Sequence, residues 1–424
     1  MQTDLAKFIK DSPEGQEADA ILRSCVHCGF CLATCPTYQL LGDELDSPRG
    51  RIYLMKQVLE GQSVTQKTQL HLDRCLTCRA CETTCPSGVR YGRLIDITRV
   101  VVEEQVKRDV LSVVIRYALR QALPNPSIFK SLLALGKVAR PLLPGSLKKS
   151  VPIRARPAKK WPAAQHTRKM LVLDGCVQPM LAPNINVATA RVLDGLGVSL
   201  IKAEKAGCCG ALVYHLNAQQ EGLDYMRRNI DAWWPLIEQK AVEAIVITAS
   251  GCGVTVKEYG YLLRHDPAYA DKAAQISALT KDISEILDAE LEYVQIMLNK
   301  QPQNQEKPKL SFHAPCTLQH GMQIRGVVEK ILLAAGFELT ITPDTHLCCG
   351  SAGTYSILQP ELSQQLLKNK VNALESGKPE QIATANIGCL THLQSGTTFP
   401  VRHWIELLDE QLFSEDKGIK QGII

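Results

Sequence analysis

One cysteine pattern occurs twice near the start of this chain, and it limits the fold more than any other feature. The pattern is Cys-x2-Cys-x2-Cys-x3-Cys-Pro, and its two copies begin 50 residues apart. The cysteines are Cys25, Cys28, Cys31 and Cys35 in the first copy, and Cys75, Cys78, Cys81 and Cys85 in the second. This run is typical of proteins that hold cubane [4Fe–4S] clusters. The pattern therefore predicts an iron–sulfur protein with two such clusters.

The spacing also predicts which cysteines share a cluster. Three thiolates at positions i, i+3 and i+6 of a tight loop hold three irons of one cube, whereas the fourth lies past the turn and ligates the other cube. We therefore expect the following ligand sets: Cys25, Cys28, Cys31 and Cys85 for cluster 1, and Cys75, Cys78, Cys81 and Cys35 for cluster 2. Pro36 and Pro86, which fix φ, turn the chain away from each loop.

Zinc sites and disulfides are the alternatives to iron–sulfur clusters. Zinc sites normally use two separated Cys-x2-Cys pairs, and disulfides require an oxidising compartment. Residues 1–24 lack the apolar core of a signal peptide, and no apolar run approaches the roughly 18 residues that cross a bilayer. Sixteen cysteines in such a chain favour a reducing compartment where thiolates are kept for metal.

Helical periodicity surrounds the two motifs. It predicts a short amphipathic helix within residues 1–24, a helix from Pro48 to Gly61, and one long helix over residues 92–123. The apolar positions of the long helix, among them Val102 and Val114, should belong mostly to the core. We therefore expect an α-helical ferredoxin-type domain over residues 1–123.

A basic, proline-rich segment follows that domain. The chain has no acidic residue between Asp109 and Asp174 but thirteen lysines and arginines, so the net charge of +5 is concentrated there. Residues 124–168 are predicted to be a linker that covers another surface, either an anionic membrane or an acidic subunit. A solvated linker without a partner is the alternative. Nucleic acid is not expected, because the segment has only two aromatic residues that could stack on bases, Phe129 and Trp161, and no nucleic-acid fold signature is present.

A second cysteine repeat, with a period of 140 over its first three cysteines, begins near Lys169. Its cysteines are Cys176, Cys208, Cys209 and Cys252 in the first copy, and Cys316, Cys348, Cys349 and Cys389 in the second. Each cysteine doublet is followed by glycine, and the two copies are most simply explained by duplication.

Each copy alternates short apolar runs with helical segments, as parallel α/β domains do. The predicted strands are 170–173, 198–202 and 244–249 in the first copy, and 310–313, 338–341 and 381–385 in the second. We therefore expect two repeated α/β domains, over residues 169–300 and 308–413. The single and final cysteines should lie just past strand C-termini, where α/β sheets place their ligand sites.

The double cluster motif followed by two Cys-Cys-Gly domains resembles one family. It contains the iron–sulfur subunits of glycolate oxidase and of anaerobic glycerol-3-phosphate dehydrogenase, and heterodisulfide reductase-like proteins. Several longer strings most resemble the glycolate oxidase members: CVHCGFCLATCPTYQLLGDELDSPRGRIYLMKQVLEG, HLDRCLTCRACETTCPSGVRYG, AGCCGALVYHLNAQ, TASGCGVTVKEYG, HLCCGSAGTY and TANIGCLTHL.

That resemblance implies a function for the whole chain. It implies a non-flavin subunit, without catalytic residues of its own, of a complex that oxidises glycolate to glyoxylate, with D-lactate as a further candidate substrate. FAD would be held only by two partner subunits, and electrons would pass through this chain to a quinone or another acceptor other than NAD. The chain would then lie at the cytoplasmic side of the bacterial inner membrane as a peripheral protein.

The sequence agrees with a separate flavin subunit, since this chain has neither a G-x-G-x-x-G loop nor a P-loop. A flavin accepts two electrons together from a hydroxy acid. The alternative classes are a thiol–disulfide enzyme that acts through Cys208-Cys209 or Cys348-Cys349, and a scaffold that anchors the flavin subunits.

This chain departs from the cysteine pattern of the family at one position in each repeat. Heterodisulfide reductase-type repeats end in Cys-x2-Cys, but here Thr255 and His392 occupy the last position. Four thiols per repeat remain as candidate ligands of a further cluster or as redox thiols. Our hypothesis from the sequence is that the repeats hold no iron–sulfur cluster.

Overall fold

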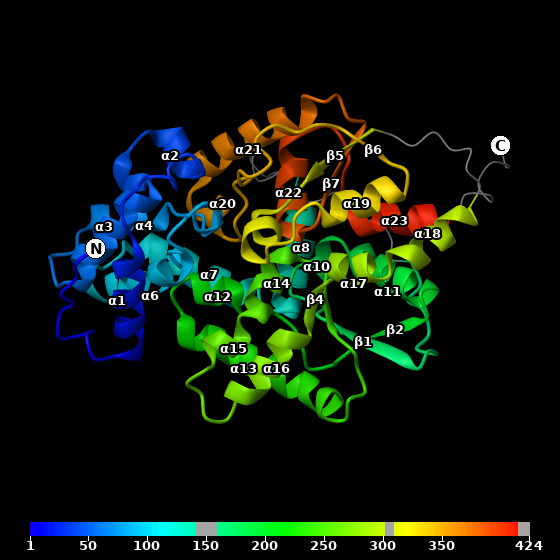
Figure 1. The fold of residues 1–424 in the computed structure, drawn as a ribbon, viewed down its shortest axis with the longest axis horizontal. Coiled ribbons are helices and arrows are strands. Elements are labelled where there is room, and N and C mark those ends of the chain that lie inside the picture. Colours follow the sequence, from blue (N-terminus) through cyan, green and yellow to red (C-terminus); the bar gives the residue numbers. More distant parts are fainter. Residues whose placement is uncertain (141–158, 302–308, 414–424) are drawn as a thin grey trace.

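The structure is a computed structural model that describes residues 1–140, 159–301 and 309–413. Figure 1 shows an all-helical N-terminal region, in blue to cyan, beside two α/β regions, in green and in yellow to red. The N-terminal region contacts both α/β regions, so all three parts pack together.

Short helices build the N-terminal region around the cysteine loops. They are α1 (Pro13–Ser24), α2 (Pro36–Leu41), η1 (Glu44–Asp46), α3 (Pro48–Leu59), α4 (Gln66–Asp73), α5 (Ala80–Thr83) and α6 (Tyr91–Gln105). The side chains of Ser12 and Ser47 cap α1 and α3, each with proline at the first helical turn. Leu22, Met55 and Leu94 are fully buried in the core between these helices.

The long helix predicted over residues 92–123 is wrong. Helix α6 ends at Gln105, and α7 (Val110–Ala122) begins anew after Asp109, whose carboxylate caps it. The break places Arg108 in ion pairs with Asp73 and Glu103, at 2.5 and 2.6 Å. The apolar positions of α6 are buried as expected, but no residue of α7 is.

The predicted linker contains a helix. Asn125 caps α8 (Pro126–Ala139), which packs against α7 and, like α7, has no buried residue. Residues 141–158 of that linker lie outside the described residues.

Each α/β region has a four-stranded, fully parallel sheet, in the orders β2-β1-β3-β4 and β6-β5-β7-β8. The strands are β1 (Arg168–Val172), β2 (Val198–Lys202), β3 (Ile245–Ile247), β4 (Thr280–Asp282), β5 (Lys309–His313), β6 (Glu338–Leu339), β7 (Gln381–Thr384) and β8 (Val401–His403). Sequence periodicity predicted three strands per copy. It missed β4 and β8, which have only three residues each.

Helices cover both sheets. The first region contains α10 (Gln178–Leu181), α11 (Asn184–Gly195), α12 (Ala211–His215), α13 (Gln219–Glu238), α14 (Ser250–Lys257), α15 (Tyr259–Leu262), α16 (Ala270–Leu279), α17 (Ile283–Ala289) and α18 (Leu291–Asn299). The second contains η3 (Thr317–Gly321), α19 (Val327–Ala334), α20 (Tyr355–Leu358), α21 (Pro360–Glu375), α22 (Ile387–Gly396) and α23 (Trp404–Leu412).

The two α/β regions share one hydrophobic core, because buried residues of both form a single cluster around α11 and α23. Polar contacts also cross between them. The His403 ring nitrogen Nε2 lies 2.9 Å from the Thr248 carbonyl oxygen, and the Ser250 amide donates to the Ala385 carbonyl at 3.3 Å. The repeats are therefore one packed unit.

Side chains fix the N-terminal region against both repeats. Arg79 pairs with Glu258 at 2.5 Å, and Arg93 donates to the Tyr214 hydroxyl at 3.0 Å, both on the first repeat. The Tyr355 hydroxyl of the second repeat donates to the Arg74 carbonyl at 3.2 Å. Among the helices of residues 1–140, 159–301 and 309–413, none is long and apolar enough to cross a membrane.

Candidate iron–sulfur centres and the cysteine repeats

The eight motif cysteines line two neighbouring hollows in the N-terminal region. Cys25, Cys28, Cys31 and Cys85 line the first hollow, and Cys35, Cys75 and Cys78 line the second. Cys81 borders both. The fourth cysteine of each motif thus faces the hollow of the other motif. This is the arrangement that the spacing argument predicts, although ligation itself remains a proposal.

The two cysteine loops share positive φ angles at matching positions. His27 and Gly29 flank Cys28 with φ of 55° and 83°, and Thr77 and Arg79 flank Cys78 with φ of 52° and 60°. Residues other than glycine rarely adopt positive φ, and such strain concentrates at functional sites. At Gly29, a Cβ would lie 2.9 Å from Arg49 Nη1, so the end of that flexible side chain would have to move.

The chemistry of the two hollows fits four-iron cubes. None of the eight cysteines forms a disulfide, and apolar or aromatic side chains such as Ile52, Val89 and Tyr91 complete the walls of the first hollow. Burial raises the pKa of Cys31 to about 11 and that of Cys78 well above its usual value. Such thiols become thiolates only when a cation compensates their charge, as iron would.

A buried ion network lies beside the second hollow. Arg51 and Arg74 pair with Asp46 at 3.0 and 2.8 Å, and Asp46 is completely buried. Cys35 and Cys75 are close enough to Arg51 to interact with it electrostatically. Arg49, at the first hollow, pairs instead with Glu44 at 2.8 Å.

In each α/β repeat the structure brings the four cysteines together. Cys208 lies beside Cys176 and Cys209, and Cys209 lies beside Cys252. In the second repeat, the Sγ atoms of Cys316 and Cys348 are 3.8 Å apart, and Cys349 interacts with Cys348 and Cys389. Cys176 and Cys316 follow β1 and β5 directly, at the C-terminal edge of each sheet.

The glycine after each doublet is required by its surroundings. Gly210 and Gly350 have φ of 87° and 89°, and a Cβ would lie 2.6 and 2.7 Å from the carbonyl oxygens of Gly222 and Ser363. The doublet therefore packs closely against α13 in the first repeat and against α21 in the second.

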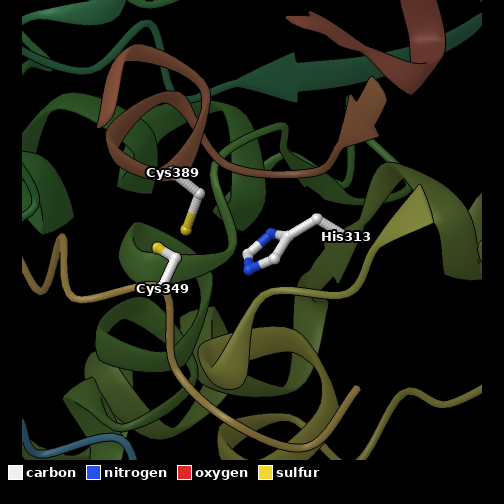
Figure 2. Close-up of side chains that lie close together, drawn as sticks. All are labelled: His313, Cys349 and Cys389. Carbon is white, nitrogen blue, oxygen red and sulfur yellow. The ribbon is translucent and has the colours of Figure 1, made fainter. Parts of the chain in front are cut away.

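The two residues at the missing fifth-cysteine position do not point to thiols. Thr255 Oγ1 donates to the Gly251 carbonyl at 3.4 Å, and His392 Nε2 lies 3.2 Å from Ser363 Oγ. A different histidine, which the sequence argument missed, lies at the thiols of the second repeat. It is His313, at the end of β5, and Figure 2 shows its ring beside Cys349 and Cys389.

His313 has an unusual environment. The residue is only 2% exposed, and its Nδ1 atom lies 3.0 Å from Thr384 Oγ1. Burial, with the Lys370 ammonium nearby, lowers the pKa of His313 to about 3, so the ring is neutral. The position three residues before the single cysteine is His313 in the second repeat and Leu173 in the first. An alignment of the two repeats would therefore have shown that only the second has a histidine there.

The second repeat also contacts the cysteine loop of the N-terminal region. Leu76 and Cys78 pack in one cluster with Cys316, Cys348 and Tyr355. The thiols of the second repeat thus lie next to a wall of the second hollow, whereas Cys28 of the first hollow is exposed.

Comparisons with known proteins agree with this division. Residues 21–89 match a 4Fe-4S dicluster domain, and residues 170–257 and 310–394 match the cysteine-rich CCG domain. The glycolate oxidase iron-sulfur subunit of Escherichia coli (strain K12) is 58% identical over 98% of this chain and 100% of its own length. A probable glycolate oxidase iron-sulfur subunit of Bacillus subtilis (strain 168) is 31% identical, over 88% of this chain and 89% of its own length. Lactate utilization protein A of Bacillus licheniformis is 26% identical over 56% of this chain and 97% of its own length.

The fold and these sites define an iron–sulfur protein in which a helical dicluster domain is joined to two cysteine-rich α/β domains. More specifically, the chain belongs to the family of glycolate oxidase iron–sulfur subunits.

Proposed function

We propose that this chain is the electron-transfer subunit of a glycolate oxidase complex. The observation that carries the proposal is the division of eight cysteines between two adjoining hollows that share Cys81. Cys25, Cys28, Cys31 and Cys85 would hold one [4Fe–4S] cluster, and Cys35, Cys75, Cys78 and Cys81 the other. A flavin accepts two electrons together from a hydroxy acid, and the two cubanes would then carry these electrons onward one at a time.

The protein surroundings prepare the two hollows for that role. Apolar walls exclude water, and the positive-φ loops turn the chain tightly around Cys28 and Cys78. The Arg51 guanidinium places a buried positive charge beside Cys35 and Cys75, which favours the more negative, reduced state of the site.

Partner subunits would contain FAD and oxidise glycolate to glyoxylate. The rim of the first hollow is suited to meet such a partner, because Val26 and Phe30 are 67% and 66% exposed beside the exposed Cys28. Exposed apolar side chains next to a redox site are typical of a docking surface. The acceptor would be a quinone or another non-NAD oxidant.

The proposal places the complex at the cytoplasmic side of the inner membrane, in contact with its surface. On α8, Ile128, Leu132 and Leu135 recur at helical spacing on one exposed face, and Val138 is 80% exposed. This helix lies in the stretch that has no acidic residue. An apolar face with basic residues and no acidic ones suits an anionic lipid surface.

A thiol–disulfide enzyme is supported less well. Such an enzyme needs an accessible thiolate, but all four doublet thiols, Cys208, Cys209, Cys348 and Cys349, are buried. The hydrogen bond with Cys208 raises the pKa of Cys209. The pKa values of Cys348 and Cys349 lie well above normal, although hydrogen bonds with Cys316 and Cys348 lower them, because a further thiol neighbour and burial raise them more. Only Cys208, which hydrogen-bonds with Cys176 and Cys209, has a lowered pKa, and its burial keeps substrates away from it.

The test is to purify the tagged chain with the proteins it retains in its native cell. Dye reduction is then assayed with glycolate, D-lactate and glycerol 3-phosphate. We expect reduction with glycolate by a preparation that contains a flavoprotein. Strong activity with glycerol 3-phosphate alone would instead assign the chain to that dehydrogenase.

The Cys28→Ser variant separates electron transfer from scaffolding. We expect it to assemble with its partners but to lose dye reduction. Full dye reduction by the assembled variant would contradict the electron-transfer role and favour a scaffold.

A further inference from the structure

We propose that the second cysteine-rich domain binds one soft divalent metal ion through His313, Cys349 and Cys389, and that the first domain does not. The donor atoms of these three residues all lie within 4.8 Å of one another (Figure 2). A tetrahedral ion with zinc–sulfur bonds of about 2.3 Å holds its ligands about 3.8 Å apart. Donor atoms within 4.8 Å of one another therefore need only small side-chain movements to share a single ion.

The three residues come from separate parts of the chain. His313 ends β5, Cys349 belongs to the doublet loop, and Cys389 lies in the first turn of α22. All three are buried. Two thiolates and one neutral imidazole are a donor set that Zn²⁺ prefers, and their charges cancel those of the ion in a buried place.

The His313 ring has a nitrogen that needs a partner. If Nδ1–H donates to Thr384 Oγ1, as their 3.0 Å distance allows, Nε2 carries a free lone pair. Among the described residues, Nε2 is buried without any hydrogen-bond partner. Metal-bound histidines are typically oriented in this way, with the second nitrogen donating to an oxygen. A metal ion would satisfy Nε2.

A buried cation supports anionic thiols at this site. Lys370 is 4% exposed, and its Nζ donates to the Asp344 carbonyl at 2.7 Å. It interacts electrostatically with the Cys349 and Cys348 thiols and with the Asp344 carboxylate. A positive charge beside a buried thiol favours its thiolate form, which is the form of cysteine that binds a metal ion.

The first repeat lacks the equivalent ligand. The sheet register pairs His313 with Thr384 in the second repeat. In the first repeat, Val172 pairs with Val246, so the next positions are Leu173 and Ile247. Both belong to an apolar cluster that includes Cys209. An apolar pair thus replaces the imidazole and its orienting hydroxyl.

The test measures zinc and iron per chain in the anaerobically purified full-length protein. We expect about one zinc ion in addition to the roughly eight irons of two cubanes. His313→Leu, which installs the residue of the first repeat, should lose the zinc and keep the iron. The matched control, Cys209→Ser with Cys252→Ser in the first repeat, should keep both.

A second variant separates ligation from packing. His313→Cys supplies another soft donor, so we expect it to retain the ion, whereas His313→Leu loses it. Co²⁺ substituted into the wild-type protein should show thiolate-to-cobalt absorption that His313→Leu abolishes. If the protein instead holds one extra iron that His313→Leu removes, the site stands as proposed and only the identity of its ion changes. No metal beyond eight irons, or zinc that persists in His313→Leu, would overturn the proposal.

Discussion

The guanidinium group of Arg51 and the carboxylate of Asp46 form a completely buried ion pair, with Nη2 3.0 Å from Oδ1. Arg51 also donates to the His71 carbonyl at 2.7 Å and to Thr37 Oγ1 at 3.0 Å. The pair therefore connects η1 and α3 to the start of α2 and the end of α4. These are the elements that lead out of the first cysteine loop and into the second.

Asp46→Asn should destabilise the N-terminal region strongly. The substitution leaves the buried Arg51 charge without its counter-charge, which costs about 3–5 kcal/mol. Anaerobic urea unfolding, followed by circular dichroism and cluster absorption, measures the change. Asp109→Asn is the control, because Asp109 is exposed and caps α7 through the Ser112 amide, away from Asp46. Equal losses in the two variants would contradict the role of the buried pair.

Serine variants of the fourth cysteines should reveal how the two clusters share ligands. Because Cys85 lines the hollow of the first motif and Cys35 that of the second, Cys85→Ser should change the same electron paramagnetic resonance signal as Cys25→Ser. Cys35→Ser should change the signal that Cys75→Ser changes. If Cys85→Ser instead changes the signal that Cys75→Ser changes, each motif holds its own cluster.

Asp282 should make the stability of the first repeat depend on pH. Burial raises its pKa to about 6 from a usual value of 3.8, although Ser284 donates to it. Between about pH 4 and pH 6, the folded protein therefore keeps a proton on Asp282 that the unfolded chain has lost. Stability from this group is full below about pH 4 and declines as pH rises to about 6, by a total on the order of 3 kcal/mol.

Asp282→Asn keeps an acceptor for the Ser284 amide but cannot titrate. We expect the difference in unfolding free energy between the wild type and this variant to change over pH 4–6, and to stay constant above pH 7. Asp109→Asn, at the exposed cap of α7, provides the comparison. A wild-type minus Asp282→Asn difference that is flat across pH 4–6 would rule out the raised pKa.

The exposed face of α8 should bind anionic lipid. Leu135→Asp and Val138→Asp place negative charge on this face, so both should lose most of the binding to vesicles that contain anionic lipid in flotation assays. Vesicles of zwitterionic lipid should bind the wild type weakly, and salt should weaken binding through screening. Ile341→Asp is the control, because Ile341 is also exposed (90%) but lies on the second repeat. Binding unchanged by the α8 substitutions would assign this face to a protein partner.

Much of the architecture could be predicted from local patterns. The cysteine spacings identified the dicluster region, and short apolar runs between helical segments indicated two parallel α/β repeats, with Val198–Lys202 predicted to the residue. The errors have physical causes. Strands β4 and β8, with the sequences Thr-Lys-Asp and Val-Arg-His, contain no apolar run of the kind that indicated the other strands. Residues 106–109 break the long helix because Arg108 gains ion pairs there, which no local propensity encodes.

By itself, the sequence determined that this chain carries two cluster motifs and two duplicated cysteine domains, because ligand spacing and hydrophobic period are local properties of a chain. Only the tertiary structure decided which side chains meet. It joined Asp46 to Arg51 and Arg74, and it placed His313 beside Cys349 and Cys389. Such contacts form between strands, loops and helices that folding alone brings together, so no spacing along the chain records them.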